Sequence, residues 1–446
     1  MALFSAARGM EEKTTMRTKE LQEQIRSGAL SGTFEYLYKN DAARQAERYA
    51  GAAAEFERLF GEREAELFSA PGRTEVGGNH TDHQHGRVLA AGVNLDVIAV
   101  AGKNDEGVIR IQSAGYPMDT IDLSDLSIRQ EETNCAAALI RGVAARFREL
   151  GMEIGGFDAY TTSDVLKGSG LSSSAAFEVL VGTILNHFYA GQKASAVQIA
   201  QIAQYAENVY FGKPSGLMDQ TASSVGGFVT IDFADVAHPQ VKKVEVDFSK
   251  SGYQLCIVDT GGNHADLTGD YAAAPAEMKS VAAQFGKQVL REVSPAEFYA
   301  KIGELRKSCT DRALLRAAHF FADDARVPQE VAALEAGDFD HFRQLVIESG
   351  HSSFMYLQNV YTCKNPDEQG LSLGLAASEQ ILSGQGAWRV HGGGFAGTIQ
   401  CFVPDSLLSD YRSGIESVFG QGSCYVLSIR PVGGVKVTPD LYKTGR

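Results

Sequence analysis

One segment, VLKGSGLSSSAAFE at residues 165–178, limits the fold of this chain more than any other part of its sequence. Just before it, from Gly156 to Asp164, apolar and polar residues alternate as in a half-buried strand. Just after it, apolar residues from Phe177 to Phe188 recur at the i, i+3, i+4, i+7 spacing of a buried helical stripe. Gly168 and Gly170 permit a tight turn between the two. The sequence therefore predicts a strand that turns sharply into a helix.

The start of this helix is suited to binding an anion. Ser172, Ser173 and Ser174 offer hydroxyl groups beside the unpaired N–H groups of the first turn, where the helix dipole is positive. This arrangement favours a cradle for a triphosphate, and a capped helix after a flexible turn is the alternative interpretation. The chain contains no GxxxxGK[ST] loop and no HRD or DFG set, so it resembles neither a P-loop NTPase nor a protein kinase.

A second informative stretch, APGRTEVGGNHTDHQHG at 70–86, is called here the polar segment. It is rich in glycine and gathers one arginine, two acids and three histidines, a polar density that indicates a polar ligand. Hydrogen bonding to a polyhydroxyl substrate suits this mixture. A metal site built from His80, Asp82, His83 and His85 is an alternative, although the spacing fits no established ligand pattern. A solvated polar turn is the third interpretation.

Two further stretches carry weaker signals. AENVYFGKPSGLMDQTAS at 206–223 places Glu207 and Asp219 on either side of a predicted helix end, where two acids are often only surface charges. RVHGGGFAGTIQCF at 389–402 places Gly392–Gly394 before a strand, so its backbone either passes close to a ligand or forms a structural turn.

Composition excludes several classes of partner. The formal net charge of −14 opposes nucleic acid and anionic membranes. The six cysteines are scattered without a CxxC pair, which is typical of reduced thiols in a cytosolic protein. The N-terminal residues lack the pattern of a signal peptide, and no apolar stretch is long enough to cross a membrane. We therefore expect a cytoplasmic protein.

The length of 446 residues predicts more than one domain. Residues 1–60 are rich in Glu, Lys, Arg and Ala and predict a helical extension packed on the outside of the first domain. We expect that domain at 61–245 and a second at 246–446, with a boundary near the basic, proline-containing stretch 238–243. The stretches expected to form strands are 88–101, 107–114, 156–164, 226–232, 253–259, 398–403 and 424–429.

Together, and in this order, the motifs PGRTEVGGNHTDHQHG, GSGLSSSAA, PSGLMDQ and HGGGFAG resemble the galactokinase branch of the GHMP kinases, which also include homoserine, mevalonate and phosphomevalonate kinases. The resemblance runs from about residue 67 to the C-terminus. It implies an α+β fold of two domains with the active site between them. The first domain would contain a left-handed βαβ crossover, an exception to the usual hand, and the second would be ferredoxin-like.

The resemblance also implies the reaction, which is phosphorylation of the anomeric C1 hydroxyl of galactose by ATP. Asp219 would take the proton from that hydroxyl, and Arg73 would keep Asp219 ionised and neutralise the transferring phosphoryl group. Ser174 and Glu207 would bind Mg²⁺. The residues implied to hold ATP are Gly168, Ser169, Gly170, Leu171, Ser172, Ser173 and Ser174. Those implied to bind the sugar are Asn79, His80, Asp82, Gly216 and Tyr271.

Two departures from the family pattern stand out. Galactokinases usually carry Gly-Glu-His-Thr-Asp-Tyr where this chain has Gly78-Asn79-His80-Thr81-Asp82-His83, so Asn79 replaces the glutamate that grips the 6-hydroxyl. His391 before the glycines is the other, and the sequence suggests no role for it.

Three alternatives to galactose phosphorylation remain open. Asn79 leaves room for a kinase acting on L-arabinose or N-acetylgalactosamine. A catalytically silent galactose sensor is a third alternative, which the intact Arg73, Glu207 and Asp219 disfavour. A monomer is slightly favoured over an oligomer.

Overall fold

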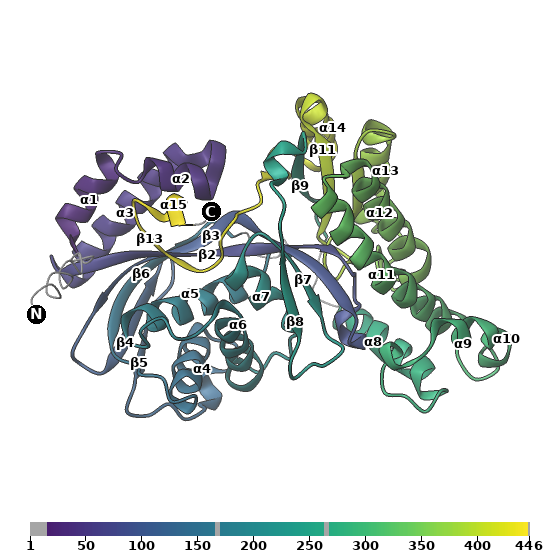
Figure 1. Ribbon diagram of the computed structural model, residues 1–446, viewed down its shortest axis with the longest axis horizontal. Coiled ribbons are helices and arrows are strands. Elements are labelled where there is room, and N and C mark those ends of the chain that lie inside the picture. Colours follow the sequence, from purple (N-terminus) through teal and green to yellow (C-terminus); the bar gives the residue numbers. More distant parts are fainter. Residues whose placement is uncertain (1–15, 166–169, 263–266, 445–446) are drawn as a thin grey trace, which may run out of the picture.

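The computed structural model describes residues 16–165, 170–262 and 267–444. Figure 1 shows two lobes joined side by side, each built from a sheet and the helices that cover it. In the part of the chain described, no helix is both long enough and apolar enough to cross a membrane.

The first lobe is built on a mixed sheet. Within the described ranges it has nine strands, in the order β1-β2-β3-β6-β4-β5, with β13 beside β2, β7 beside β3 and β8 beside β7. Their bounds are β1 (Met16–Arg17), β2 (Glu64–Gly77), β3 (Arg87–Lys103), β4 (Val108–Ser113), β5 (Met118–Asp122), β6 (Phe157–Ser163), β7 (Phe228–Asp232), β8 (Gln240–Val244) and β13 (Val435–Val437). The strands expected at 88–101, 107–114, 156–164 and 226–232 are confirmed.

Helices cover both faces of this sheet because side chains alternate between the two faces along each strand. Leu67 of β2 and Ile98 of β3 pack against the N-terminal helices, whereas the next residues in line, Phe68 and Val97, pack against the internal helices. The first face carries α1 (Thr18–Arg26), α2 (Ser31–Tyr38) and α3 (Ala42–Phe60). The second face carries α4 (Ala136–Glu149), α5 (Ser173–Phe188), α6 (Ala196–Tyr205) and α7 (Met218–Val225). The N-terminal helices are therefore a layer of the first lobe, as expected (Figure 1).

Strands β4 and β6 pair in parallel, and α4 lies in the connection between them. This is the βαβ crossover that the resemblance implies. Its left hand stays a prediction.

Among the residues described, the second lobe has a four-stranded antiparallel sheet in the order β10-β11-β9-β12. Its strands are β9 (Tyr253–Asp259), β10 (Ala387–Val390), β11 (Thr398–Pro404) and β12 (Cys424–Leu427), and α14 (Leu408–Phe419) connects the last two. The βαββαβ succession and this strand order are those of a ferredoxin-like domain. The connection from β9 to β10 is enlarged by α8 (Thr268–Ala283), α9 (Pro295–Ala300), α10 (Ile302–Leu305), α11 (Asp311–Ala336), α12 (Phe339–Ser352) and α13 (Gly370–Leu382).

The chain changes sheets just after the stretch 238–243, in the interval that contains the expected boundary between residues 245 and 246. That stretch is mostly strand β8, which pairs with β7 in the first sheet, so the change falls between Val244 and Tyr253. After β12 the chain also returns, because β13 pairs with β2 and α15 (Leu441–Thr444) packs beside α2. The last residues of the predicted second domain, 246–446, thus belong to the first sheet.

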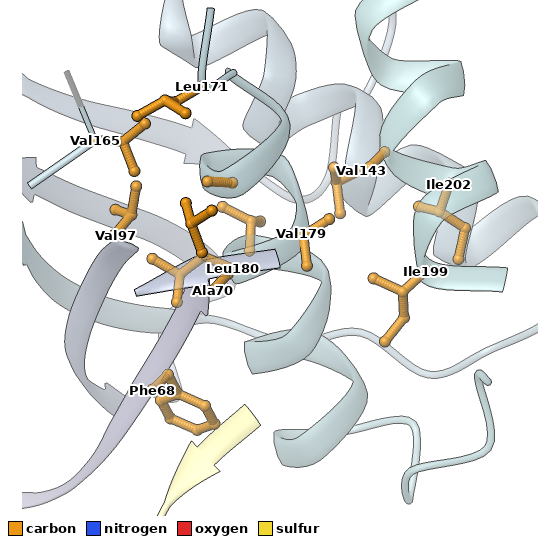
Figure 2. Close-up of a cluster of buried hydrophobic side chains, with 14 of the residues drawn as sticks. Phe68, Ala70, Val97, Val143, Val165, Leu171, Val179, Leu180, Ile199 and Ile202 are labelled. Carbon is orange, nitrogen blue, oxygen red and sulfur yellow. The ribbon is translucent and has the colours of Figure 1, made fainter. Parts of the chain in front are cut away.

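A buried cluster anchors the segment that turns from β6 into α5 (Figure 2). Val165 and Leu171, on either side of this turn, are buried with Val97 of β3 and with Val179 and Leu180 of α5. Apolar contacts therefore hold the described residues on either side of this turn, so that α5 begins at a fixed place against the sheet.

Candidate active site

A bulge in β2 directs Arg73 toward the start of α5. The pairing of β2 with β3 shifts register between Pro71 and Arg73. Gly72 fits there because a Cβ atom on it would come within 2.9 Å of the Leu171 carbonyl oxygen. The Arg73 N–H donates to that same carbonyl at 3.0 Å. Bulges of this kind re-aim side chains beside active sites.

Arg73 and Asp219 form an ion pair, although 146 residues separate them along the chain. The Arg73 Nε and Nη2 atoms lie 2.8 and 2.7 Å from Oδ1 of Asp219, which is in the first turn of α7. Ser172 Oγ donates to Oδ2 at 2.6 Å. Burial by itself would raise the pKa of Asp219, but Arg73 and the Ser172 hydroxyl outweigh it and lower that pKa below its usual value. The carboxylate is therefore ionised at neutral pH and able to accept a proton.

The phosphate loop, residues 168–174, is described from Gly170 onward, and Gly168 and Ser169 lie outside the described residues. Gly170 has a φ of +71°, and a Cβ on it would approach His391 Nδ1 to 3.1 Å. Leu171 is buried, Ser172 caps the helix with a left-handed φ of 57°, and Ser173 is the first residue of α5. The hydroxyl groups of Ser172, Ser173 and Ser174 thus gather at a helix N-terminus, as expected.

Ser174 and Glu207 meet beside this helix end. Glu207 lies in a π-helical turn, η4 (Ala206–Phe211), that continues α6, and π-helical turns are frequent at functional sites. Its Oε1 accepts from Ser174 Oγ at 3.0 Å and from Lys213 Nζ at 2.9 Å. Gln220 Nε2 donates to its Oε2 at 2.8 Å and to the buried Glu178 at 3.2 Å. Burial, followed by the charge of Glu207, raises the pKa of Glu178 well above its usual value.

These atoms fit a magnesium ion. The Ser174 hydroxyl and the Glu207 carboxylate are hard oxygen donors of the kind that Mg²⁺ takes, with phosphate and water as further ligands. The Lys213 ammonium already places a positive charge on the same carboxylate oxygen.

The polar segment is only partly a loop. Its residues 70–77 belong to β2, and a short 3₁₀ turn, η2 (Asp82–Gln84), follows. Across the described ranges, no three His, Cys, Asp or Glu side chains are grouped to hold a metal ion, which leaves the histidine-rich metal site without support. Asp82 instead faces Gly216, where an added Cβ would lie 2.9 Å from Asp82 Oδ2. The structure thus brings these two predicted sugar residues together beside the segment that leads to Asp219.

His80 is a buried, neutral hydrogen-bond acceptor. Its Nε2 lies 3.0 Å from the Gly393 carbonyl oxygen, which can only accept, so Nε2 carries the proton. Its Nδ1 is buried and has no hydrogen-bond partner among the described residues. Burial, aided by the nearby His83, lowers the pKa of His80 to about 4. The ring therefore offers a free lone pair to a hydroxyl group.

The glycine loop, residues 391–397, closes the site from the second lobe. Tyr271 of α8 donates to the Gly394 carbonyl at 2.9 Å. His391 lies 3.1 Å from the Thr74 hydroxyl of β2 and 2.9 Å from Thr398 of β11, which ties the root of the loop to the residue next to Arg73. The structure thus shows the contacts of His391, for which the sequence suggested no role.

Asn79 is the predicted sugar residue whose position differs most from expectation. It is fully buried, and its side chain bonds to protein atoms on every side. The sequence did not indicate its partners Ser353 and Asn359, because no local pattern links residues about 280 positions away. Lys213 and Gln220 were also missed, although both lie inside the motif that contains Asp219.

Comparison with known proteins identifies the family. A family model described as "GHMP kinases N terminal domain" matches residues 138–227, and one described as "Galactokinase galactose-binding signature" matches residues 54–103. The mevalonate kinase of Methanococcus jannaschii shares the fold, with a TM-score of 0.59 at 14% identity over 81% of this chain and 98% of that one. The fold and the site together define a GHMP kinase.

Proteins with similar sequences show to which branch of the GHMP kinases the chain belongs. The chain is 32% identical to a galactokinase of Streptomyces coelicolor over 377 residues, which is 84% of this chain and 94% of that protein. It is 31% identical to one of Actinobacillus pleuropneumoniae, over 81% of this chain and 91% of that protein. The chain belongs to the galactokinase family. The crystal structure of Lactococcus lactis galactokinase complexed with galactose superposes with a TM-score of 0.73 at 25% identity, over 86% of this chain and 98% of that one.

Proposed function

We propose that this protein transfers the γ-phosphoryl group of ATP to the anomeric C1 hydroxyl of galactose, giving galactose 1-phosphate and ADP. It is a sugar kinase, and the observation that carries the proposal is the ion pair of Asp219 with Arg73 beside the phosphate loop. The substrate follows from the family and from the acceptor groups of the polar segment.

Asp219 acts as the general base. As the C1 oxygen attacks the γ-phosphorus, its proton passes to a carboxylate oxygen of Asp219, the bond from the γ-phosphorus to the β,γ-bridging oxygen breaks, and ADP leaves. Arg73 keeps Asp219 ionised and faces the charge that develops on the transferring group. A loose phosphoryl transition state requires such positioning and charge stabilisation more than covalent help.

The helix N-terminus of α5 and the hydroxyl groups of Ser172 and Ser173 hold the phosphates. Ser174 and Glu207 would hold Mg²⁺, supported by their 3.0 Å contact and by the positive charge of Lys213 on the same oxygen. When bound, the metal neutralises phosphate oxygens of ATP.

Asp82, His80, Gly216 and Tyr271 are proposed to line the sugar pocket, with the His80 Nδ1 lone pair accepting a sugar hydroxyl. A second candidate substrate is L-arabinose, which has the ring configuration of galactose without C6. The neutral, fully engaged Asn79 favours it, because no carboxylate is offered at that position. We further propose that the protein works in the cytoplasm as a monomer.

A substrate panel tests the function. ADP release is followed with D-galactose, 6-deoxygalactose, L-arabinose and N-acetylgalactosamine, and D-galactose is expected to give the highest kcat/KM. In the same assay Asp219→Asn should lower kcat by about 10²- to 10⁴-fold, the usual share of a general base, with ATP binding little changed. A variant within about tenfold of the parent rate would rule out proton removal by Asp219. If L-arabinose is turned over as well as galactose, the proposal of galactose as the substrate is wrong.

A further inference from the structure

The three carbonyl groups of Gly392–Gly394 are each held by a side chain that the sequence assigned to the sugar pocket. Asn79 Nδ2 donates to the first at 2.7 Å, His80 Nε2 to the second at 3.0 Å and Tyr271 Oη to the third at 2.9 Å. The glycine loop therefore docks on the pocket residues themselves.

Asn79 differs from His80 and Tyr271 because every hydrogen-bonding position of its side-chain amide is occupied. Its two N–H donors are used by Glu75 Oε1 and by the Gly392 carbonyl, both at 2.7 Å. Its oxygen accepts from Ser353 Oγ at 3.2 Å and from Asn359 Nδ2 at 2.9 Å. An amide offers two donors and two acceptor lone pairs, so all four positions are filled.

The partners also require a neutral amide. Both groups that face Nδ2 are acceptors, and one of them, the Glu75 carboxyl group, is paired with Arg389 at 3.0 Å. A carboxylate at position 79 would place its oxygens against these two acceptors in a fully buried site. The glutamate found at this position in other galactokinases would therefore not fit the surroundings that this chain has built.

We infer that Asn79 is a positioning residue, whose amide fixes the glycine loop against the polar segment, and that it does not contact the sugar. This inference rests on the proposed function only for its kinetic test. Asn359, whose Nδ2 donates to the Asn79 oxygen, also accepts the Phe395 N–H at its backbone carbonyl oxygen at 2.5 Å, so a partner of Asn79 contacts the glycine loop beyond Gly394 as well.

The first test compares two sugars in Asn79→Asp, a change of nearly equal shape that removes both donors. Losing two buried hydrogen bonds should lower kcat/KM by about 10- to 10²-fold for D-galactose and for L-arabinose alike. The ratio of the two kcat/KM values should then stay within about threefold of the parent ratio. Asn365 is exposed and lies outside the site, so Asn365→Asp makes the same chemical change there and should leave kcat/KM unchanged for both sugars. If Asn79 binds the C6 end, the ratio will fall while L-arabinose turnover holds, and the inference is overturned.

The second test needs no activity. Hydrogen–deuterium exchange of residues 391–397 in the ligand-free protein should be at least about tenfold faster in Asn79→Asp than in the parent or in Asn365→Asp. Unchanged exchange would overturn the inference. A parent protein inactive on galactose would end the proposed function yet leave this measurement to decide the role of Asn79.

A double variant separates the two contacts that the Asn79 amide donates. In Glu75→Gln with Asn79→Asp the amide at position 75 can donate to the carboxylate at position 79, but position 79 still lacks a donor for the Gly392 carbonyl, so exchange in the glycine loop should stay as fast as in Asn79→Asp. Exchange restored to the parent rate would mean that the contact with Gly392 does not hold the loop, and the inference is overturned. If Asn79→Asp does not fold, Asn79→Ser, which removes the amide without adding charge, takes its place in both measurements with the same expected outcomes.

Discussion

Glu330 is expected to control how the stability of this protein depends on pH. It lies within α11, its side chain is fully buried, and neither carboxyl oxygen has a hydrogen-bond partner among the described residues. It packs against Gly77 at the end of β2, where no Cβ could fit. Burial, with the charge of Asp323 added, raises its pKa from 4.5 to about 8.

The size of the effect follows from this difference. Between the two pKa values the folded protein keeps a proton that the unfolded chain has released, so stability falls as pH rises through that window. At about 1.4 kcal/mol per pKa unit, the loss between pH 5 and pH 9 is on the order of 4–5 kcal/mol. Glu330→Gln replaces the protonated acid by a neutral group of the same shape. The free energy of unfolding of this variant should match that of the parent within about 1 kcal/mol at pH 5 and exceed it by several kcal/mol at pH 9.

Urea unfolding at the two pH values measures this, with the buried Trp388 as the fluorescent probe. Titrating groups that do not interact with Glu330 contribute equally to parent and variant and cancel in the comparison, whereas Glu75, whose pKa is raised by burial to about 7, acts on Glu330 and adds a smaller difference. The exposed Glu35→Gln is the matched control, because water solvates that carboxylate in the folded and unfolded states. If parent and Glu330→Gln lose the same stability between pH 5 and pH 9, Glu330 is solvated or ionised in the folded protein and the reasoning fails.

Two further predictions concern the metal and the phosphate loop. Glu207→Ala should raise the Mg²⁺ concentration for half-maximal activity, and Ser174→Ala should do so more mildly because a hydroxyl carries no charge. Lys213→Met should lower the Mg²⁺ requirement, since the ammonium competes for the same oxygen of Glu207. Mn²⁺ binding, followed by electron paramagnetic resonance, would show the weaker binding in Glu207→Ala and the tighter binding in Lys213→Met without turnover. An unchanged metal requirement in Glu207→Ala would place the ion elsewhere. Gly170→Ala should raise KM for ATP by about tenfold with the sugar KM nearly unchanged, because a left-handed φ costs a side chain about 1–2 kcal/mol and the added Cβ meets His391; initial-rate kinetics with an unaltered ATP KM would contradict it.

The sequence alone determined the elements that depend on neighbouring residues. The alternation before Val165 and the helical stripe after Ser174 fixed a strand, a turn and a helix, because side-chain period and turn chemistry act over a few residues. The roles of Asp219 and Arg73 were expected from the resemblance of four motifs to the galactokinase branch, because local pattern alone left Asp219 as a surface charge. The structure joins them in one ion pair.

Tertiary structure alone decided what surrounds these groups. Asn79 was expected at the 6-hydroxyl of the sugar, yet its partners include Ser353, Asn359 and Gly392, all more than 270 residues further along the chain. The strand Val435–Val437 returns to the first sheet for a similar reason, since pairing with β2 depends on where the second lobe delivers the chain. A buried amide must satisfy all its hydrogen bonds, but which distant atoms satisfy them is set by packing. A local sequence pattern therefore does not indicate which distant atoms these are.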